Sequence, residues 1–548
     1  MPIAMTPPQD AVEARTMSDI AAAVGSGNLR RAYDLSNWAI TRGMTGRIVH
    51  NARALALQAS GRQREAIEDF RRALTFSPND PGILNAIGMS ELSLLLFPDA
   101  IRSFEAAIAI EPSNPLTHYR LGMAYGMSGE HEAARPAYER AVLLKPDYTE
   151  ALASLASLTA RKGEAQIARD YAQKALTLDP AEPTALLALA ILDIGDKRFA
   201  EAEPQLRSLA ANPRLNVMAR SGVQSLLGDA LDGQERYAEA FAAYQATNDE
   251  VRRQLGAQFE SARGADAVGH LTAYFKDASP ERWMAPDEGD GFASDCRQHV
   301  FLLGFMRSGT TLLEQILASN PDVVALEEKG TLNALGTTFM TSNDGMDALS
   351  DLRGGDLAAA RRLYWEKVAA SGESPGGKIF VDKQPLNTLK LPLIAKLFPQ
   401  ARILFALRDP RDVVFSCFRR HFRVNPTAFE FLTLEGAAQF YSAIMSLAQI
   451  YREKLKLDIL DHYYEDMVTD FEPRVRAVCE FIGLEWSDSM REFNRNAPKV
   501  DLRSPSARQV QRPLYGEGVG QWRRYAEQLS SIQPIVRPWV EKFGYPAE

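Results

Sequence analysis

The loop at residues 304–311 carries the strongest chemical signal in the sequence. It has the spacing G-x-x-x-x-G-x-T, with Gly304 and Gly309 at the two glycine positions. A loop of small residues lets backbone N–H groups converge on an anion, and a helix starting near Thr310 adds the positive end of its dipole. Enzymes that hydrolyse ATP or GTP keep a lysine at the position of Thr310, whereas here Arg307 supplies the cation. The loop therefore predicts phosphate binding and argues against a P-loop kinase.

Charged residues also follow the other apolar runs of the second half. We expect strands at 299–304, 323–326, 378–381, 402–407 and 457–464, with helices such as 310–319 and 391–397 between them. This alternation predicts an α/β domain with a parallel, doubly wound sheet, in which ligands bind beyond the carboxyl ends of the strands. Charged residues stand at those ends: Glu327, Glu328, Lys383, Arg408, Glu465 and Asp466.

A repeat of 34 residues fills the first half. One alanine series runs through Ala32, Ala66, Ala100, Ala134, Ala168 and Ala202, and a proline series through Pro78, Pro112, Pro146 and Pro180. The pattern resembles the tetratricopeptide repeat, a helix–turn–helix unit whose copies stack into a superhelix because one pair alone cannot bury its apolar face. Ala240 and Tyr244 mark a further, degenerate repeat. We expect about seven units, and arrays of this family generally bind proteins or peptides.

Two runs in the second half carry a further resemblance. FMRSGTTLLEQILASNPDVVALEE begins at Phe305, and LFALRDPRDVVFSCF begins at Leu404. Together they resemble the sulfotransferases that use 3′-phosphoadenosine 5′-phosphosulfate (PAPS), over about residues 298–548. The resemblance implies that PAPS is the donor, with its 5′-phosphosulfate held by Arg307, Ser308, Gly309, Thr310 and Thr311 and its 3′-phosphate by Arg408 and Ser416.

Within that family, the second half looks most like tyrosylprotein sulfotransferases and bacterial relatives that carry repeat arrays. This likeness implies that Glu328 is the general base and that Lys383, in DKQP, is a catalytic lysine beside Arg307. It also implies that Ser506 assists at the departing phosphate. A carboxylate within reach of a hydroxyl can accept its proton, and fixed cations stabilise the charge that develops on the leaving group.

The sequence departs from the tyrosylprotein pattern near its C-terminal end. Gln521 stands where those enzymes have a lysine, directly before the tryptophan that Trp522 matches. Candidates to supply the missing charge to the nucleotide are Arg512, Arg523 and Arg524.

Several other residues have simpler interpretations. Strand side chains alternate, so Glu327 is expected to point away from its neighbour Glu328. The cluster Arg419, Arg420 and Arg423 is typical of a solvated helix face, with contact to an anionic acceptor as the alternative. We interpret His421 as non-catalytic, and Cys417 and Cys479 as core residues.

Composition limits the class of protein. The chain has 548 residues, a formal net charge of −8 and three cysteines, which excludes bulk nucleic-acid binding and a disulfide framework. We expect neither a signal peptide nor a membrane span, and hence a cytoplasmic protein. The expected organisation is a repeat array at 14–250, a linker at 251–297 and a sulfotransferase domain at 298–548.

The leading hypothesis is a sulfotransferase that moves a sulfuryl group from PAPS to an acceptor hydroxyl without a metal. The acceptor is a protein or peptide, such as a tyrosine held by the repeats, or another hydroxyl compound, and the sequence is compatible with an oligomer. The alternative is an interaction scaffold whose nucleotide-binding domain is inactive. The full set Arg307, Glu328, Lys383, Arg408 and Ser416 argues against that loss of activity.

Overall fold

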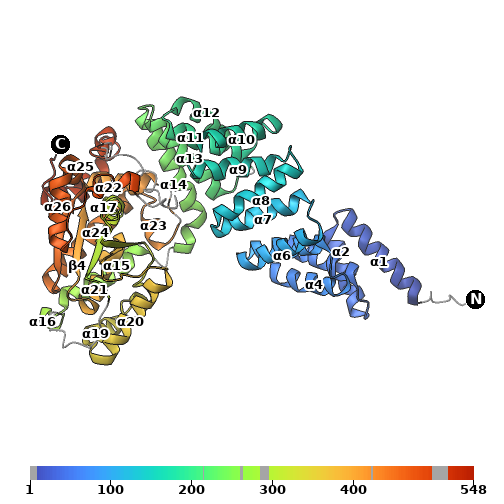
Figure 1. The fold of residues 1–548 in the computed structure, drawn as a ribbon, viewed down its shortest axis with the longest axis horizontal. Coiled ribbons are helices and arrows are strands. Elements are labelled where there is room, and N and C mark those ends of the chain that lie inside the picture. Colours follow the sequence, from blue (N-terminus) through green and yellow to red (C-terminus); the bar gives the residue numbers. More distant parts are fainter. Residues whose placement is uncertain are drawn as a thin grey trace, which may run out of the picture. The chain divides into compact units, whose positions relative to one another are not determined.

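Short helices follow one another through the N-terminal part of the chain, as the computed structural model shows (Figure 1). The structure describes residues 9–213, 215–259, 263–283, 295–420, 422, 424–496, 516 and 518–547. It forms two compact units, Met1–Gln205 and Leu206–Glu548.

The first unit is built from helical pairs. Its helices are α1 (Gln9–Gly25), α2 (Leu29–Thr41), α3 (Arg47–Ala59), α4 (Gln63–Phe76), α5 (Pro81–Ser93), α6 (Phe97–Ile110), α7 (Pro115–Ser128), α8 (His131–Leu144), α9 (Thr149–Arg161), α10 (Ala165–Leu178), α11 (Pro183–Gly195) and the first part of α12 (Phe199–Ala210), inside which the division between the units falls.

Small residues lie where the two helices of a pair touch. Gly88 of α5 faces the Phe104 ring of α6, and a Cβ added at Gly88 would come within 2.6 Å of that ring. Gly122 faces the Tyr138 ring of α8 in the same way. The alanines of the 34-residue series are buried as well. The predicted helix–turn–helix repeat is therefore confirmed, and close helix approach explains its small residues.

The ends of the repeat helices follow from their local sequence. Asp80 accepts hydrogen bonds from the N–H groups of Gly82 and Ile83 and so caps α5, whose first residue is Pro81. A proline is tolerated there because the first N–H of a helix has no partner within the helix. The prolines of the repeat, such as Pro78 after α4, stand just beyond helix ends, where they prevent continuation.

After the end of α12, the second unit continues with a helical pair of the same kind, α13 (Val217–Asp232) and α14 (Tyr237–Phe259). A Cβ added at Gly228 would run into the Tyr244 ring. Gly228 lies as far before Ala240 as Gly88 lies before Ala100, so this pair reproduces the contact of the regular repeats. The degenerate repeat inferred from Ala240 and Tyr244 thus packs as a repeat.

The segment 251–297, expected as a linker, is mostly helical in its described part. It holds the end of α14, then α15 (Gly264–Asp277) and α16 (Pro280–Trp283). The Glu430 carboxylate accepts hydrogen bonds from the Arg263 side chain and the Ala265 N–H group. These contacts fix the start of α15 against the C-terminal domain, so the segment is part of the second unit.

A parallel sheet of five strands forms the centre of the second unit, as predicted. Its strands are β1 (Gln298–Gly304), β2 (Val323–Glu327), β3 (Ile379–Lys383), β4 (Arg402–Leu407) and β5 (Asp458–Tyr463), in the order β2-β3-β1-β4-β5. The chain crosses to β2 and β3 on one side of β1 and then to β4 and β5 on the other. Such a switch point opens a crevice beyond the strand ends, where ligands bind.

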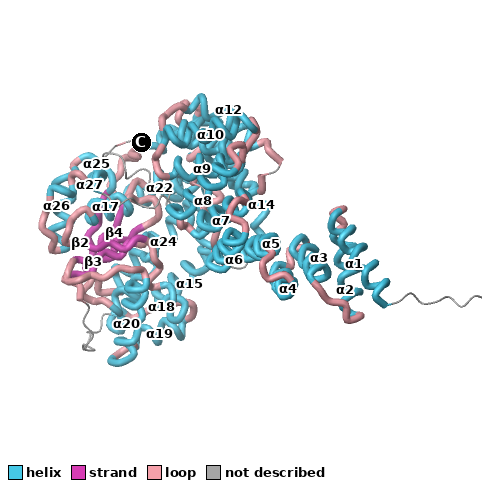
Figure 2. Tube along the Cα trace, turned by 45° about the vertical axis from the view of Figure 1, so that its right-hand side comes forward, coloured by secondary structure: helices cyan, strands magenta, loops and turns pink. Residues whose placement is uncertain are grey.

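Helices lie on both sides of the strands (Figure 2). They are α17 (Thr310–Ala318), α18 (Asn333–Phe339), α19 (Asn343–Asp351), α20 (Gly354–Ala370), α21 (Leu391–Leu397), α22 (Pro410–Arg419), α23 (Pro426–Glu430), α24 (Leu434–Lys454), α25 (Tyr464–Thr469), α26 (Phe471–Ile482), α27 (Phe493–Asn496) and α29 (Gln533–Lys542), with 3-10 turns η1 (Pro385–Lys390), η2 (Asp488–Met490), η3 (Gln521–Tyr525) and η4 (Ser530–Ile532). One face of the sheet packs against α17 and α26 through residues such as Val300, Leu313 and Val478. Side chains with aromatic rings, including Phe301, Tyr364 and Phe398, fill the other.

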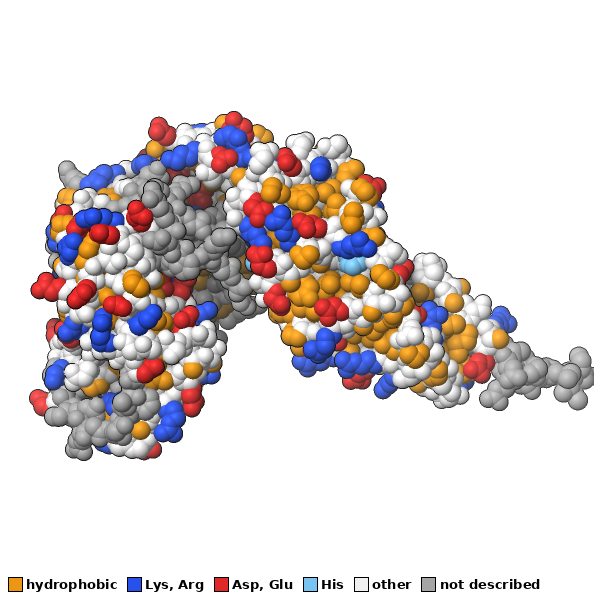
Figure 3. Space-filling model, in the orientation of Figure 1, with side chains coloured by type: hydrophobic (Ala, Val, Ile, Leu, Met, Phe, Trp, Pro, Cys, Tyr) orange, Lys and Arg blue, Asp and Glu red, His pale blue; other side chains and the backbone are white. Residues whose placement is uncertain are grey.

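Hydrophobic side chains also reach the surface of the repeat helices, as the face in Figure 3 shows. In the first unit, Phe76, Leu95, Met127 and Leu143 are each at least half exposed. Among the described residues, no helix is long and apolar enough to cross a membrane.

Replacing Gly228 with Ala tests the close approach of α13 and α14. The added methyl group would overlap the Tyr244 ring, so we expect a loss of about 1–3 kcal/mol in the free energy of unfolding. Gly222 lies in the same helix with no atom within 4 Å of an added Cβ. Gly222→Ala should instead stabilise by roughly 0.5–1 kcal/mol, because alanine favours helix. Denaturant titrations would measure both, and equal effects would contradict the packing described.

Candidate functional site

The loop after β1 reverses the chain sharply above the crevice. Gly304 has a φ of +149°, and a Cβ there would collide with the Ala406 carbonyl of β4. Gly309 has a φ of +91°, and a Cβ there would lie 2.6 Å from the Tyr464 ring. Only glycine fits both positions. The two glycines therefore set the loop so that α17 begins at Thr310, with its N-terminal N–H groups and dipole beside the loop.

Arg307 lies at the tip of this loop, with a φ of +68° that an L-residue rarely adopts. Its Nε donates a hydrogen bond to the Oγ of Ser416 on α22, at 3.0 Å. The Nη1 of Arg408 donates to the Arg307 carbonyl, also at 3.0 Å. The structure thus brings Arg307 together with Arg408 and Ser416, which lie about a hundred positions further along the sequence.

Arg408 follows β4 and is itself buried. It donates a second hydrogen bond to the Gly518 carbonyl, lies 3.8 Å from the Asp412 carboxylate, and places its guanidinium 4.9 Å from the centre of the Tyr464 ring. These contacts fix the planar guanidinium from several sides. A guanidinium held this way can bind phosphate oxygens with two parallel hydrogen bonds.

Positive charge is concentrated around Arg307. Burial, together with the neighbouring charges of Arg420, Arg408 and Arg419, lowers the pKa of Arg307 to about 9. Cations that repel one another in a poorly hydrated place favour the binding of an anion. The electrostatics of the crevice therefore suit a ligand with phosphate or sulfate groups.

The arginines at the end of α22 do not form the solvated helix face that the sequence predicted. Arg419 is only 8% exposed. Its guanidinium donates to the Gln521 side chain at 2.5 Å, and Arg420 pairs with Asp229 at 2.9 Å. The interpretation was wrong because helices α13 and α14, far away in the sequence, cover this end of α22. Arg423 lies outside the described residues.

A second cluster surrounds Lys383, the last residue of β3. Its Nζ is 2.8 Å from Glu328 and 3.2 Å from both Glu327 and Glu314, and 3.5 Å from the Thr311 hydroxyl. The Lys383 side chain is fully buried. Burial alone would lower the pKa of Lys383, but the three carboxylates outweigh it and raise the pKa, so the ammonium stays charged.

Glu327 and Glu328 both face Lys383, which corrects the expectation that Glu327 points away. The Glu328 N–H donates to the Lys383 carbonyl at 2.9 Å, and Glu328 has a φ of +48°. Strand alternation therefore ends at Glu327, and the turn at Glu328 brings its carboxylate to the same side. The Glu328 side chain remains 44% exposed, so a hydroxyl from solvent can reach it.

Glu314 is the site residue that the sequence analysis missed. It lies on α17, is buried, and faces Lys383 from behind the loop. Burial raises the pKa of Glu314 to about 8 against the opposing charge of Lys383, with Glu327 and Glu328 adding to the rise. A glutamate within the apolar run TTLLEQILA was the available signal, because such a residue is rarely buried without a partner.

Asp382 anchors the chain just after Glu328. It is buried in β3 and accepts hydrogen bonds from the Thr331 hydroxyl at 2.7 Å and the Tyr364 hydroxyl at 2.8 Å. Tyr364 in turn lies 2.9 Å from the His299 ring. This buried chain of contacts ties the loop that carries Glu328 to the sheet, which holds the carboxylate near Lys383.

The remaining predicted residues have different outcomes. Ser308, Thr310 and Thr311 are buried in the loop and the first turn of α17. Arg523 and Arg524 lie against the rings of Trp522 and Tyr237. Ser506, Arg512 and His421 lie outside the described residues.

Cys417 and Cys479 are buried, as expected, and burial raises the pKa of the Cys417 thiol to about 12. Within the described ranges, no group of three or more His, Cys, Asp or Glu residues could hold a metal ion.

Family models match both halves of the chain. Residues 299–488 match the model of the sulfotransferase family. Residues 49–80, 85–147 and 119–183 match models of the tetratricopeptide repeat. The sulfotransferase match covers β1 to β5 and therefore includes both charge clusters.

Similar proteins include both named and unnamed relatives. An uncharacterised protein of Aquifex aeolicus (strain VF5) is 24% identical over 355 residues, which cover 62% of this chain and 44% of that protein. Protein-tyrosine sulfotransferase 1 of Danio rerio is 24% identical over 45% of this chain and 72% of its own length. Protein-tyrosine sulfotransferase of Drosophila melanogaster is 28% identical over 41% of this chain and 46% of its own length. The chain thus spans less than half the length of the first and third of these relatives.

The raised pKa of Glu314 predicts a pH-dependent stability. The unfolded chain releases this proton near the ordinary pKa of a glutamate, whereas the folded chain keeps it to about pH 8. The folded state therefore binds more protons in between, and the free energy of unfolding should fall from about pH 5 to pH 8, by up to about 1 kcal/mol per pH unit.

Glu314→Gln should remove the part of this fall in the free energy of unfolding between about pH 5 and pH 8 that Glu314 causes. Denaturant titrations at several pH values would measure it, with the exposed Glu366→Gln as the control. Parallel curves for wild type and Glu314→Gln would contradict the burial of a protonated carboxyl group at this position.

Proposed function

Since the chain carries a sulfotransferase-family domain together with tetratricopeptide repeats, we propose that it transfers a sulfuryl group from PAPS to an acceptor hydroxyl. The observation that carries this proposal is the pair of charge clusters at one sheet edge. Arginines converge where β1 and β4 end, and a lysine with carboxylates lies where β2 and β3 end. The first suits a donor with several phosphate groups, and the second suits proton transfer from a hydroxyl.

The donor would lie across the switch point of the sheet. Arg408 and Ser416 would hold its 3′-phosphate, and the N–H groups of the loop at 304–311 its 5′-phosphosulfate, with Arg307 between them. Arg307 already contacts both Ser416 and Arg408, so the two phosphate positions share one continuous cationic surface. The fit rests on the chemistry of these groups, because guanidinium and backbone N–H donors are the usual partners of phosphate oxygens.

In the reaction, the acceptor oxygen forms a bond to sulfur while the bond from sulfur to the bridging oxygen of the donor breaks. Glu328 would accept the acceptor's proton, since its carboxylate lies 2.8 Å from the Lys383 ammonium and is open to solvent. Lys383 and Arg307 would neutralise the negative charge that appears on the departing phosphate. Lys383 lies beside Thr311 of the donor loop, which would place its ammonium next to the 5′-phosphosulfate. Ser506 would assist there, as the resemblance implies.

The proposed acceptor is a hydroxyl on a protein or peptide, such as a tyrosine side chain. Two considerations support it: the names of the Danio and Drosophila relatives, and the repeats of the first unit with their exposed apolar side chains. The repeats would then select the acceptor chain. The negative net charge of −8 fits the proposal that local cationic sites, rather than the whole surface, bind the anionic donor.

Arg408→Ala tests the donor site. Removing the guanidinium should weaken the binding of adenosine 3′,5′-bisphosphate about 10- to 100-fold, because hydrogen bonds to charged groups contribute roughly 1.5–3 kcal/mol each. Isothermal titration calorimetry would measure it. Arg491→Ala, in which the exposed partner of Glu472 is lost, is the control and should bind like the wild type. Unchanged affinity of Arg408→Ala would contradict the assignment.

Glu328→Gln separates binding from chemistry. The variant should keep its affinity for adenosine 3′,5′-bisphosphate and lose about 10²- to 10⁴-fold in transfer, the usual contribution of a general base. Transfer of labelled sulfate from PAPS to a tyrosine peptide would measure the second quantity. Full transfer by Glu328→Gln would show that another group takes the proton. If Glu327→Gln lost transfer while Glu328→Gln kept it, that group would be Glu327.

A further inference from the structure

Helices α13 and α14 pack directly on α22, the helix that carries Ser416. Phe241 of α14 stacks on Phe418, with ring centres 5.3 Å apart, and Tyr244 of α14 meets Phe415 edge-on at 6.4 Å. Phe415 and Phe418 belong to α22 and are buried. The degenerate repeat therefore supports α22, the helix that carries Ser416 of the proposed donor site.

The C-terminal end of α22 is completed by side chains of the same pair. The Asn248 side chain of α14 donates to the Phe418 carbonyl at 2.9 Å, and the Ser225 hydroxyl of α13 donates to the Arg419 carbonyl at 3.3 Å. The last carbonyls of a helix have no partner within it, and buried ones need another donor. Helices α13 and α14 supply those donors, so the end of α22 depends on them.

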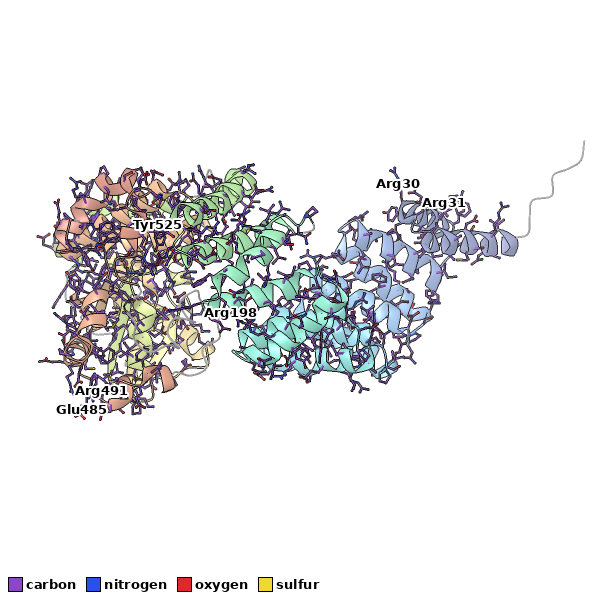
Figure 4. All side chains as sticks on the ribbon, turned by 90° about the horizontal axis from the view of Figure 1, so that it is seen from above. Arg30, Arg31, Arg198, Glu485, Arg491 and Tyr525 are labelled. Carbon is purple, nitrogen blue, oxygen red and sulfur yellow. The ribbon has the colours of Figure 1, made fainter. Side chains whose placement is uncertain are left out.

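Two carboxylates of α13 hold the arginines at this end. Asp229 pairs with Arg420 at 2.9 Å, and Asp232 lies 3.9 Å from Arg419. Asp229 and Asp232 are three residues apart, so both lie on one face of α13. Each aspartate is fixed in turn by a tyrosine hydroxyl: Tyr244 donates to Asp229 at 2.9 Å, and Tyr525 (labelled in Figure 4) donates to Asp232 at 2.5 Å.

The held arginines act on the donor site through their charge. Arg420, the C-cap residue of α22, follows Ser416 by four residues and so lies one helical turn beyond it on the same side of the helix. After burial, the charge of Arg420 is the largest cause of the lowered pKa of Arg307, and Arg419 adds to it. A flexible arginine among like charges would turn away toward solvent. Pairing with Asp229 uses one edge of the Arg420 guanidinium and keeps the charge close to Arg307 and Ser416, so that the site stays cationic before any anion binds.

We propose that Asp229 is a positioning residue of the donor site: it holds Arg420 toward the 3′-phosphate position beside Ser416. The last repeat is then a component of the sulfotransferase domain as well as a repeat. This inference rests on the proposed function, because it takes the anion at Ser416 to be the 3′-phosphate of the donor.

The test compares two ligands on the full chain. Adenosine 3′,5′-bisphosphate carries the 3′-phosphate, whereas adenosine 5′-monophosphate lacks it. Asp229→Asn should weaken bisphosphate binding about 10-fold and leave monophosphate binding within about 2-fold, as measured by calorimetry. Asp249→Asn, at an exposed aspartate of α14, is the matched control and should change neither.

A double-mutant cycle with Arg420→Ala adds a second readout. If Asp229 acts through Arg420, Asp229→Asn should cost little further bisphosphate affinity once Arg420 is gone. Tyr244→Phe provides a milder variant that keeps the ring packing and removes only the hydroxyl on Asp229. It should lower the ratio of bisphosphate to monophosphate affinity about 2- to 3-fold, and it remains informative if Asp229→Asn fails to fold.

The outcomes are distinct. An unchanged affinity ratio in Asp229→Asn and Tyr244→Phe, an equal loss for both ligands, or additive effects with Arg420→Ala would each overturn the inference, since a purely structural role would produce them. Failure of the wild type to bind the bisphosphate at all would overturn the proposed function itself. A selective, non-additive loss of bisphosphate affinity supports both.

Discussion

Repulsion among arginines at one sheet edge is the constraint on which the second unit depends. Arg307 and Arg408 are brought into contact by the ends of β1 and β4, and the charges of Arg419 and Arg420 at the end of α22 add to theirs. Holding these charges together costs free energy, which the structure offsets with fixed hydrogen bonds to carbonyl groups and with carboxylates placed behind the cations. The arrangement leaves a strongly positive crevice, and an anion of matching shape would stabilise it.

The Lys383 cluster has the opposite balance of charge. Three carboxyl groups surround one ammonium. Glu314, behind the loop, is the carboxyl group that retains a proton, because burial raises its pKa. Thr311 and Glu314 both come from α17, which also carries the donor loop. One helix therefore connects the two clusters, and their spacing follows from where Gly304 and Gly309 let α17 begin.

Much of this architecture could be predicted from residue spacing. The strands, the small residues of the repeats, and the placement of Arg307 and Arg408 at one edge follow from periodicity and from the rule that parallel strands end at one edge, whereas Ser416 was expected only from the resemblance. The orientation of Glu327, the burial of Arg419 and the role of α13 could not, because each depends on a turn with positive φ or on contacts between segments about 190 residues apart. Ser506 and Arg512 remain predictions from the resemblance.

Thermal unfolding of the wild-type chain with added nucleotide tests the central claim most directly. If the arginine crevice binds the donor's two phosphate positions, adenosine 3′,5′-bisphosphate should raise the melting temperature in a saturable way, by roughly 2–4 °C for each 1 kcal/mol of binding-linked stabilisation. Adenosine 5′-monophosphate and inorganic phosphate at the same concentration should raise it less. Equal shifts with all three ligands, or none with the bisphosphate, would contradict the account.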